Sequence, residues 1–148
     1  MDIENTNVAE RTYAIFLGTD GADQIKTIQI DPEEKMLHFL RKNIGCDIVE
    51  VVRARMLKKP YIMIVDEEGL MKLDTKVNAL ASVLYGALEH GNPIVGNAVI
   101  LREEVTEDGG EFQLMTGKEA KEWVPRLSQL AWSAVKDTYN KDNDDEDE

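Results

Sequence analysis

The sequence predicts an α+β fold, with an antiparallel or mixed sheet and about three helices in the order ββα-ββα-ββα. Segments rich in β-branched or alternating apolar residues occur in pairs, and turn residues separate the two members of each pair. Each pair precedes a segment whose apolar residues recur at helical spacing. The 148 residues suit a single domain, and we expect the helices to cover one side of the sheet.

The first unit combines a hairpin with a helix. Thr12–Leu17 is expected to be a strand, and a glycine-containing turn joins it to a second strand over Gln24–Ile30. Asp31-Pro32 is a typical helix start, because Asp accepts bonds from the first free N–H groups and Pro loses nothing at the first helical position. Apolar residues then recur at helical spacing over residues 36–44, and Gly45 suits the left-handed residue that ends a helix.

The second unit repeats this pattern. Asp47–Arg53 and Tyr61–Val65 are rich in β-branched residues and are predicted to be strands, and Asp66–Gly69 is predicted to be a turn. We expect Thr75 to cap the next helix. Gly86 weakens that helix, so its predicted end is the preceding tyrosine.

The third unit completes the domain. Ile94–Leu101 is almost entirely apolar and is predicted to be a central strand, followed by a short strand over Glu111–Met115. Thr116 and Glu119 form a capping box in which each side chain is expected to satisfy the other residue's backbone donor. Pro125 is expected to kink or restart the final helix.

Acidic residues outnumber basic ones, and part of the excess is concentrated near Glu148. The chain contains 29 Asp and Glu against 17 Lys and Arg, a formal net charge of −12. Residues 141–148 hold six acids and one base, a net charge of −5, which leaves −7 on the first 140 residues. We expect residues 1–10 to be flexible, 11–139 to form one α+β domain, and 140–148 to be a disordered acidic tail.

The same charge excludes several classes of partner. An acidic surface lacks the Lys and Arg that displace phosphate counterions, so neither nucleic acid nor anionic lipid is an expected direct partner. No apolar run approaches the roughly 20 residues of a membrane helix, and the first residues lack the features of a signal peptide. The single cysteine, Cys46, cannot form an internal disulfide, which indicates a reducing, cytoplasmic environment.

Few residues are suited to catalysis or metal binding. Cys46 lies between a helix end and a strand, where a small buried cysteine is common. His38 and His90 fall on different helices at no ligand spacing, whereas zinc needs three or four such ligands. We expect no catalytic residue, no metal site and no cofactor, and therefore a protein that is not an enzyme.

Three stretches of the chain carry a resemblance to a known family. They are GCDIVEVVRARML from Gly45, YIMIVDEEG from Tyr61, and IVGNAVIL from Ile94. Over about residues 24–123 the sequence resembles DUF3846, a family of small domains of unknown function. The resemblance implies a phage, plasmid or conjugative-element setting and supplies no reaction. It also singles out Asn78 and the turn after Val65, although a helix cap and a tight turn explain the same residues structurally.

Two kinds of function are compatible with these observations. In the first, the protein is a non-enzymatic accessory protein of a phage or mobile element. It binds and inhibits a host defence nuclease, of the restriction or CRISPR type, through an acidic surface that mimics DNA. The residues expected to contact this host protein are Asp66, Glu67, Glu68, Trp132, Asp144, Asp145 and Glu146.

The alternative is a small-molecule binding protein that counteracts host defence by binding a nucleotide signal. Such a site needs a pocket with a few polar groups among apolar walls, and a cation for the phosphate. The residues expected to form it are Arg53, Arg55, Asn78 and Arg102.

Overall fold

The protein is described from a computed structural model, which covers the backbone of residues 10–19, 25–86 and 92–146. Side chains are described within these ranges as far as Ser133, except at position 131. Of residues 1–10, which are expected to be flexible, 1–9 lie outside the described residues, as does the histidine at position 90.

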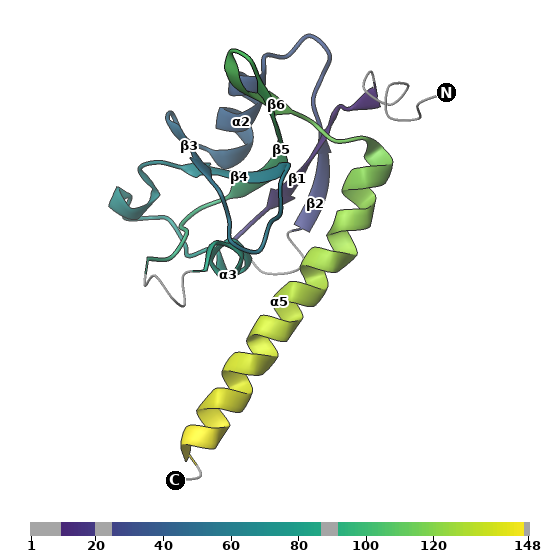
Figure 1. Cartoon of the computed structure of the whole chain (residues 1–148). Coiled ribbons are helices and arrows are strands. Elements are labelled where there is room, and N and C mark those ends of the chain that lie inside the picture. The colour runs from purple at the N-terminus through teal and green to yellow at the C-terminus, as the bar shows by residue number, and fades with distance from the viewer. Residues whose placement is uncertain (1–9, 20–24, 87–91, 147–148) are drawn as a thin grey trace.

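The observed elements follow the predicted order ββα-ββα-ββα (Figure 1). They are β1 (Tyr13–Leu17), β2 (Ile25–Gln29), α2 (Met36–Ile44), β3 (Val49–Val52), β4 (Tyr61–Asp66), the short 3₁₀ helix η3 (Gly69–Met71), α3 (Ala79–Tyr85), β5 (Ala98–Thr106), β6 (Gly109–Gln113) and α5 (Gly117–Glu146). The prediction of an α+β fold is confirmed.

The six strands form one antiparallel sheet in the order β2-β1-β5-β4-β3, and β6 pairs with the far part of β5. Strand β5 is central, because it pairs with β1 and β4 through its apolar half and with β6 through its polar half. Ile100 lies opposite both Ile15 of β1 and Met63 of β4, and all three are fully buried. The sheet is therefore antiparallel throughout and not mixed.

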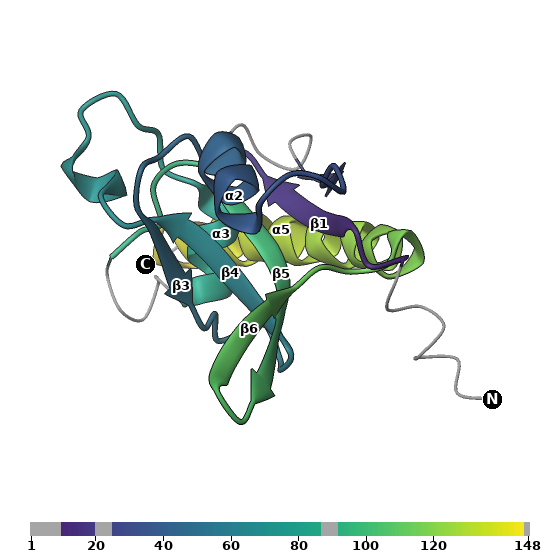
Figure 2. The same ribbon diagram turned by 90° about the horizontal axis from the view of Figure 1, so that it is seen from above.

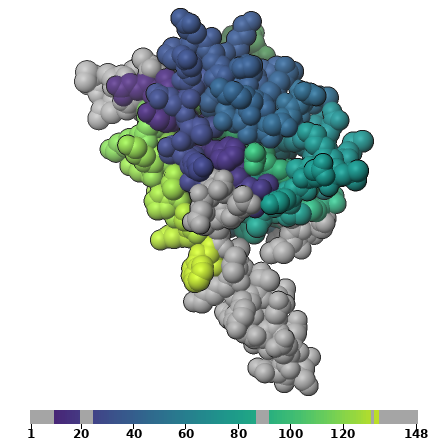
Figure 3. Space-filling model, turned by 180° about the vertical axis from the view of Figure 1, so that it is seen from behind, coloured from purple at the N-terminus to yellow at the C-terminus, as the bar shows by residue number. Residues whose placement is uncertain are grey.

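Helices cover both faces of the sheet, so the expectation that they lie on one side is wrong. Five consecutive residues of β4, from Ile62 to Asp66, are buried, and successive side chains of a strand point to opposite faces. Ile62 and Ile64 pack in the core under α2, whereas Met63 and Val65 pack in the core under α3 and α5. Figures 1 and 3 view the molecule from opposite sides, with α5 in front in the first and α2 in front in the second.

Two helices start later than predicted. Helix α2 begins at Met36, because Lys35 is extended and separates the helix from the turn at Asp31-Pro32. Helix α3 begins after Asn78, which caps it in place of Thr75. Both helix ends are as predicted, since a glycine in the left-handed conformation follows each one.

The central strand is displaced toward the C-terminus relative to the prediction. Strand β5 begins at Ala98, because Gly96 adopts a φ of 87° that interrupts an extended chain. Val95 makes only an isolated bridge to Val77. At its other end, β5 continues through the charged residues to Thr106 and forms a hairpin with β6.

The last helix is longer and more regular than predicted. Helix α5 runs without a break through Pro125, so the expected kink or restart is absent. It continues to Glu146 and so includes residues 140–146 of the acidic segment. Once a helix is nucleated, each added residue contributes a hydrogen bond at little cost, which favours continuation over a second start. The second half of α5 projects beyond the sheet (Figure 1).

Candidate functional site

The acidic turn after β4 contains one structural carboxylate and two exposed ones. Asp66 is buried, and its Oδ1 accepts a hydrogen bond of 2.9 Å from the backbone N–H of Glu68. Its Oδ2 lies 2.6 Å from the Lys72 ammonium. This hydrogen bond to Asp66 raises the pKa of Lys72. Asp66 therefore holds the turn together, and only Glu67 and Glu68 present carboxylates to solvent.

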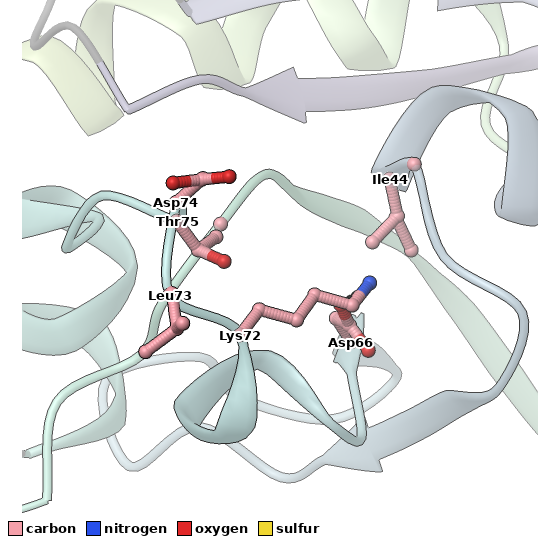
Figure 4. Close-up of a pocket in the computed structure, with 8 residues that line it drawn as sticks. Ile44, Asp66, Lys72, Leu73, Asp74 and Thr75 are labelled. Carbon is pink, nitrogen blue, oxygen red and sulfur yellow. Dashed lines mark ion pairs between the residues drawn. The ribbon is translucent and has the colours of Figure 1, made fainter.

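A hollow of about 480 Å³ lies beside this turn (Figure 4). Ile44 lies on one side of it, and Asp74 and Thr75 lie on the other. The Lys72–Asp66 ion pair lies between them. Burial raises the pKa of the Cys46 thiol, and the Asp66 charge raises it further. The hollow thus combines apolar walls with charged groups of both signs.

Asn78 is a structural residue in the centre of the fold. Its side chain is fully buried, and its Nδ2 donates hydrogen bonds of 2.9 Å to the carbonyls of Leu17 and Gly96. Its Oδ1 accepts the backbone N–H of Ala81 at 3.1 Å, which caps α3. These three bonds join β1, α3 and the loop before β5, and they account for an asparagine at this position.

The three arginines of the alternative site do not converge on one pocket. Arg53 is exposed and lies 2.5 Å from Glu103 Oε1. Arg102 lies on the face of β5 that packs against α5. Arg55 is exposed on the connection between β3 and β4. Neither the hollow beside Lys72 nor a smaller one next to η3, of about 180 Å³, is lined by any of the three.

A cluster that the sequence did not indicate attaches α5 to the sheet. The Tyr61 hydroxyl donates a hydrogen bond to Glu119 Oε2, and Arg102 Nη1 lies 2.6 Å from the same oxygen. The Tyr61 and Trp123 rings pack edge-to-face, with 4.8 Å between their centres. The Arg102 guanidinium lies 5.7 Å from the centre of the Tyr61 ring. Burial raises the pKa of Tyr61, and the bond to Glu119 raises it further.

This cluster corrects the predicted capping box. The Thr116 hydroxyl accepts the Glu119 N–H at 3.1 Å, as predicted. The Glu119 carboxylate, however, accepts bonds from Tyr61 and Arg102, which come from distant parts of the chain. A charge-assisted bond to a guanidinium is stronger than a bond to a neutral N–H, and this explains the preference.

The β5–β6 hairpin carries a second set of carboxylates, none of which is among the contact residues expected from the sequence. Five of the nine residues 103–111 are acidic and none is basic. Glu104 and Glu111 are directly opposite each other, and like charges in this register destabilise a strand pair. Arg11 lies 3.0 Å from Glu104 and offsets part of this repulsion. The hairpin extends away from the body of the protein (Figure 2).

The tip of this hairpin is exposed and locally ordered. Glu107 and Asp108 form its two-residue turn, and both are exposed, as is Glu111. The Thr106 hydroxyl donates a hydrogen bond of 2.9 Å to the Gly109 carbonyl and closes the turn. Within the described part of the chain, these three carboxylates have no ion pair. We call this set of three carboxylates the acidic tip.

The remaining predicted contact residues lie along α5. Trp132 is 71% exposed, so it contributes little to the core. Asp144, Asp145 and Glu146 belong to the last turns of the helix, and their side chains lie outside the described residues. The acidic turn and the acidic tip lie at opposite ends of β4 and β5, because Ile64 pairs with Val99 whereas the tip follows Thr106. The acidic groups therefore form separate surfaces.

Fold and site together define a small α+β domain with exposed carboxylates on a projecting hairpin and on the turn after β4. Among the described residues, no group of three or more His, Cys, Asp or Glu could hold a metal ion, and no helix is long and apolar enough to cross a membrane. The chain belongs to the DUF3846 family, a domain of unknown function, whose family model matches residues 14–128. The resemblance expected over 24–123 is confirmed over this wider range. Comparisons with curated proteins and with solved structures gave no match.

Proposed function

We propose that this protein is a non-enzymatic accessory protein of a phage or other mobile element. It inhibits a host defence nuclease, of the restriction or CRISPR type, by occupying the basic surface on which that enzyme holds nucleic acid. The observation that carries this proposal is the acidic tip: Glu107, Asp108 and Glu111 are exposed, free of ion pairs within the described residues, and placed on a projecting hairpin.

Electrostatics explains how such a tip would compete with DNA. Duplex DNA presents about one negative charge per 1.7 Å of its axis, and nucleases bind it through Lys and Arg side chains. Carboxylates can pair with the same side chains. Because the hairpin is held by backbone pairing and by the Thr106–Gly109 bond, little conformational entropy is lost when it docks. The net charge of −12 also steers the protein toward a basic surface.

The alternative, binding of a nucleotide signal, has less support from the geometry. A phosphate site needs several donors that converge on one hollow. Asn78 is occupied by three intramolecular bonds, Arg53 is paired with Glu103, and Arg102 is paired with Glu119. We therefore favour the protein partner.

An inhibition assay tests the proposal. DNA cleavage by a purified restriction endonuclease or CRISPR effector from a host is measured with increasing amounts of three proteins. These are the wild type, the tip variant Glu107→Gln/Asp108→Asn/Glu111→Gln, and a control that removes the same charge elsewhere, Asp31→Asn/Glu33→Gln/Glu122→Gln. All six positions are exposed.

We expect the wild type and the control to inhibit equally, and the tip variant to be weaker by about 10-fold to 100-fold. This range assumes about 0.5–1 kcal/mol for each lost charge pair. Equal inhibition by the two triple variants would assign the effect to net charge alone and would contradict the proposal. Absence of inhibition by the wild type against both classes of nuclease would also contradict it.

A further inference from the structure

A second surface, at the other end of the sheet, exposes apolar side chains that the fold does not use. Residues 70–77 follow the turn after β4 and carry four large apolar side chains with exposed fractions of 64%, 80%, 100% and 53%. We call this set the apolar ridge; its members are Leu70, Met71, Leu73 and Val77. Single exposed apolar residues are ordinary, but four within eight residues are typical of an interaction site. Side chains of this segment stand at the right edge of the surface in Figure 3.

The loop that carries the ridge is fixed by the core. Asp66 binds the backbone N–H of Glu68 on one side and the Lys72 ammonium on the other, so it ties both ends of η3. Gly69 is buried against Val95, where a Cβ atom would lie 2.9 Å from the carbonyl oxygen. The ridge is therefore presented in a preset arrangement, which lowers the entropy lost on binding.

The hollow of about 480 Å³ adjoins the ridge, because Leu73 belongs to both. Figure 4 shows the Asp74 and Thr75 side chains on one side of it and Ile44 on the other. The Lys72 charge is already paired with Asp66, whereas the Asp74 carboxylate has no ion pair or hydrogen bond within the described residues. An Arg side chain suits such a hollow, since its apolar stem can contact Ile44 while its guanidinium reaches a carboxylate.

The charges around the ridge identify the kind of partner. Glu67, Glu68 and Asp74 are exposed beside it, and they outnumber Lys76, an exposed lysine of the same segment, whereas the Lys72 charge is balanced by Asp66. A second copy of this chain would bring the same carboxylates against one another, and like charges across an interface are costly. A segment that combines apolar residues with Lys or Arg would instead complement both the ridge and its acidic border.

We propose that the apolar ridge binds an amphipathic, basic helical segment of a partner protein, and that one Arg of this segment enters the hollow toward Asp74. The apolar side chains of the segment cover Met71 and Leu73. This surface is separate from the acidic tip, so the inference does not depend on the proposed function.

Binding of labelled peptides tests the inference. The probe is a fluorescein-labelled helical peptide with Leu on one face and Arg on its flanks. A second peptide replaces every Leu by Ser and keeps the Arg residues, and a third replaces every Arg by Glu and keeps the Leu residues. Fluorescence anisotropy gives the affinity for full-length wild type, for Met71→Ser/Leu73→Ser, for Asp74→Asn, and for the controls Val105→Ser and Glu122→Gln. Val105 is 84% exposed on the hairpin and matches the ridge residues in exposure.

We expect the Leu/Arg peptide to bind the wild type and both controls alike. The ridge variant should bind it at least about 10-fold more weakly, because two apolar contacts are lost. Asp74→Asn should weaken binding of the Leu/Arg peptide and should slightly strengthen the weak binding of the Leu/Glu peptide, because it removes a like-charge repulsion. All of these positions are exposed, so circular dichroism should show the same fold in every variant.

Three results would overturn the inference. The first is failure of the Leu/Arg peptide to bind the wild type. The second is equal binding of the Leu/Arg and Ser/Arg peptides, which would indicate charge attraction without an apolar site. The third is a dimer of the wild type in sedimentation experiments that Met71→Ser/Leu73→Ser dissociates, because the ridge would then be covered by a second copy of the chain.

Discussion

Replacement of Asn78 by Ala should be among the most destabilising single changes in this protein. The variant removes a helix cap, which contributes about 1 kcal/mol, and leaves the buried carbonyls of Leu17 and Gly96 without their donors. Each buried group left unsatisfied costs about 1–3 kcal/mol. With the lower half of this range for each carbonyl, which keeps a second lone pair for other donors, we expect a loss of about 3–5 kcal/mol in the free energy of unfolding. Asn78→Ser, which keeps a capping oxygen, should recover about 1 kcal/mol of this loss.

Urea unfolding followed by circular dichroism measures this effect. With a slope of about 2 kcal/mol/M, the midpoint for Asn78→Ala should fall by about 2 M at an unchanged slope. Asn43→Ala is a suitable control, because Asn43 is partly buried and makes one hydrogen bond, to the Phe39 carbonyl. It should cost no more than about 1 kcal/mol. A loss below about 1 kcal/mol for Asn78→Ala would refute the structural role and would favour the ligand-binding role that the sequence offered.

Three further predictions concern the pH dependence and the local packing. Because burial and Glu119 raise the pKa of Tyr61, the folded state keeps this proton above pH 10, where the unfolded chain loses it. The free energy of unfolding should thus decline less steeply between about pH 9 and 11 in Tyr61→Phe than in the wild type. The same pH dependence in both proteins, measured by urea unfolding at each pH, would contradict this. Gly69→Ala should cost about 1–3 kcal/mol, because its Cβ would meet the Val95 carbonyl; an unchanged melting temperature would argue against the described η3 packing. Trp132→Ala should change stability by less than about 0.5 kcal/mol in the same assay, and a larger loss would mean that the indole is buried.

Local patterns predicted most elements of the fold because each pattern has a local cause. Alternation and β-branched residues identified the strand pairs, and Gly45 and Gly86 ended their helices through a left-handed conformation that glycine adopts freely. The predicted start of α2 was wrong because Lys35 is extended, and that of α3 was wrong because it depends on distant partners. Asn78, for example, bonds to Leu17, which is 61 residues away in the chain.

Local patterns also did not determine which residues of the candidate sites are free to bind a partner. The sequence predicts that Asp66 is an exposed residue of a turn, but its ion pair with Lys72 gives it a structural role. The acids of residues 103–111 are visible in the sequence. Their importance depends on the position of β5, which begins after Gly96 and continues into an exposed hairpin. The ridge at residues 70–77 could not be distinguished from a strand or a core segment without its exposure.

The central claim is that the acidic tip binds the basic nucleic-acid surface of a host nuclease. Its most direct test is the affinity for such a nuclease as a function of salt concentration, measured for the wild type, the tip variant and the charge-matched control. We predict that log Kd rises steeply with log salt for the wild type and the control, and less steeply for the tip variant, because fewer ion pairs form. The same slope for all three proteins would contradict the claim.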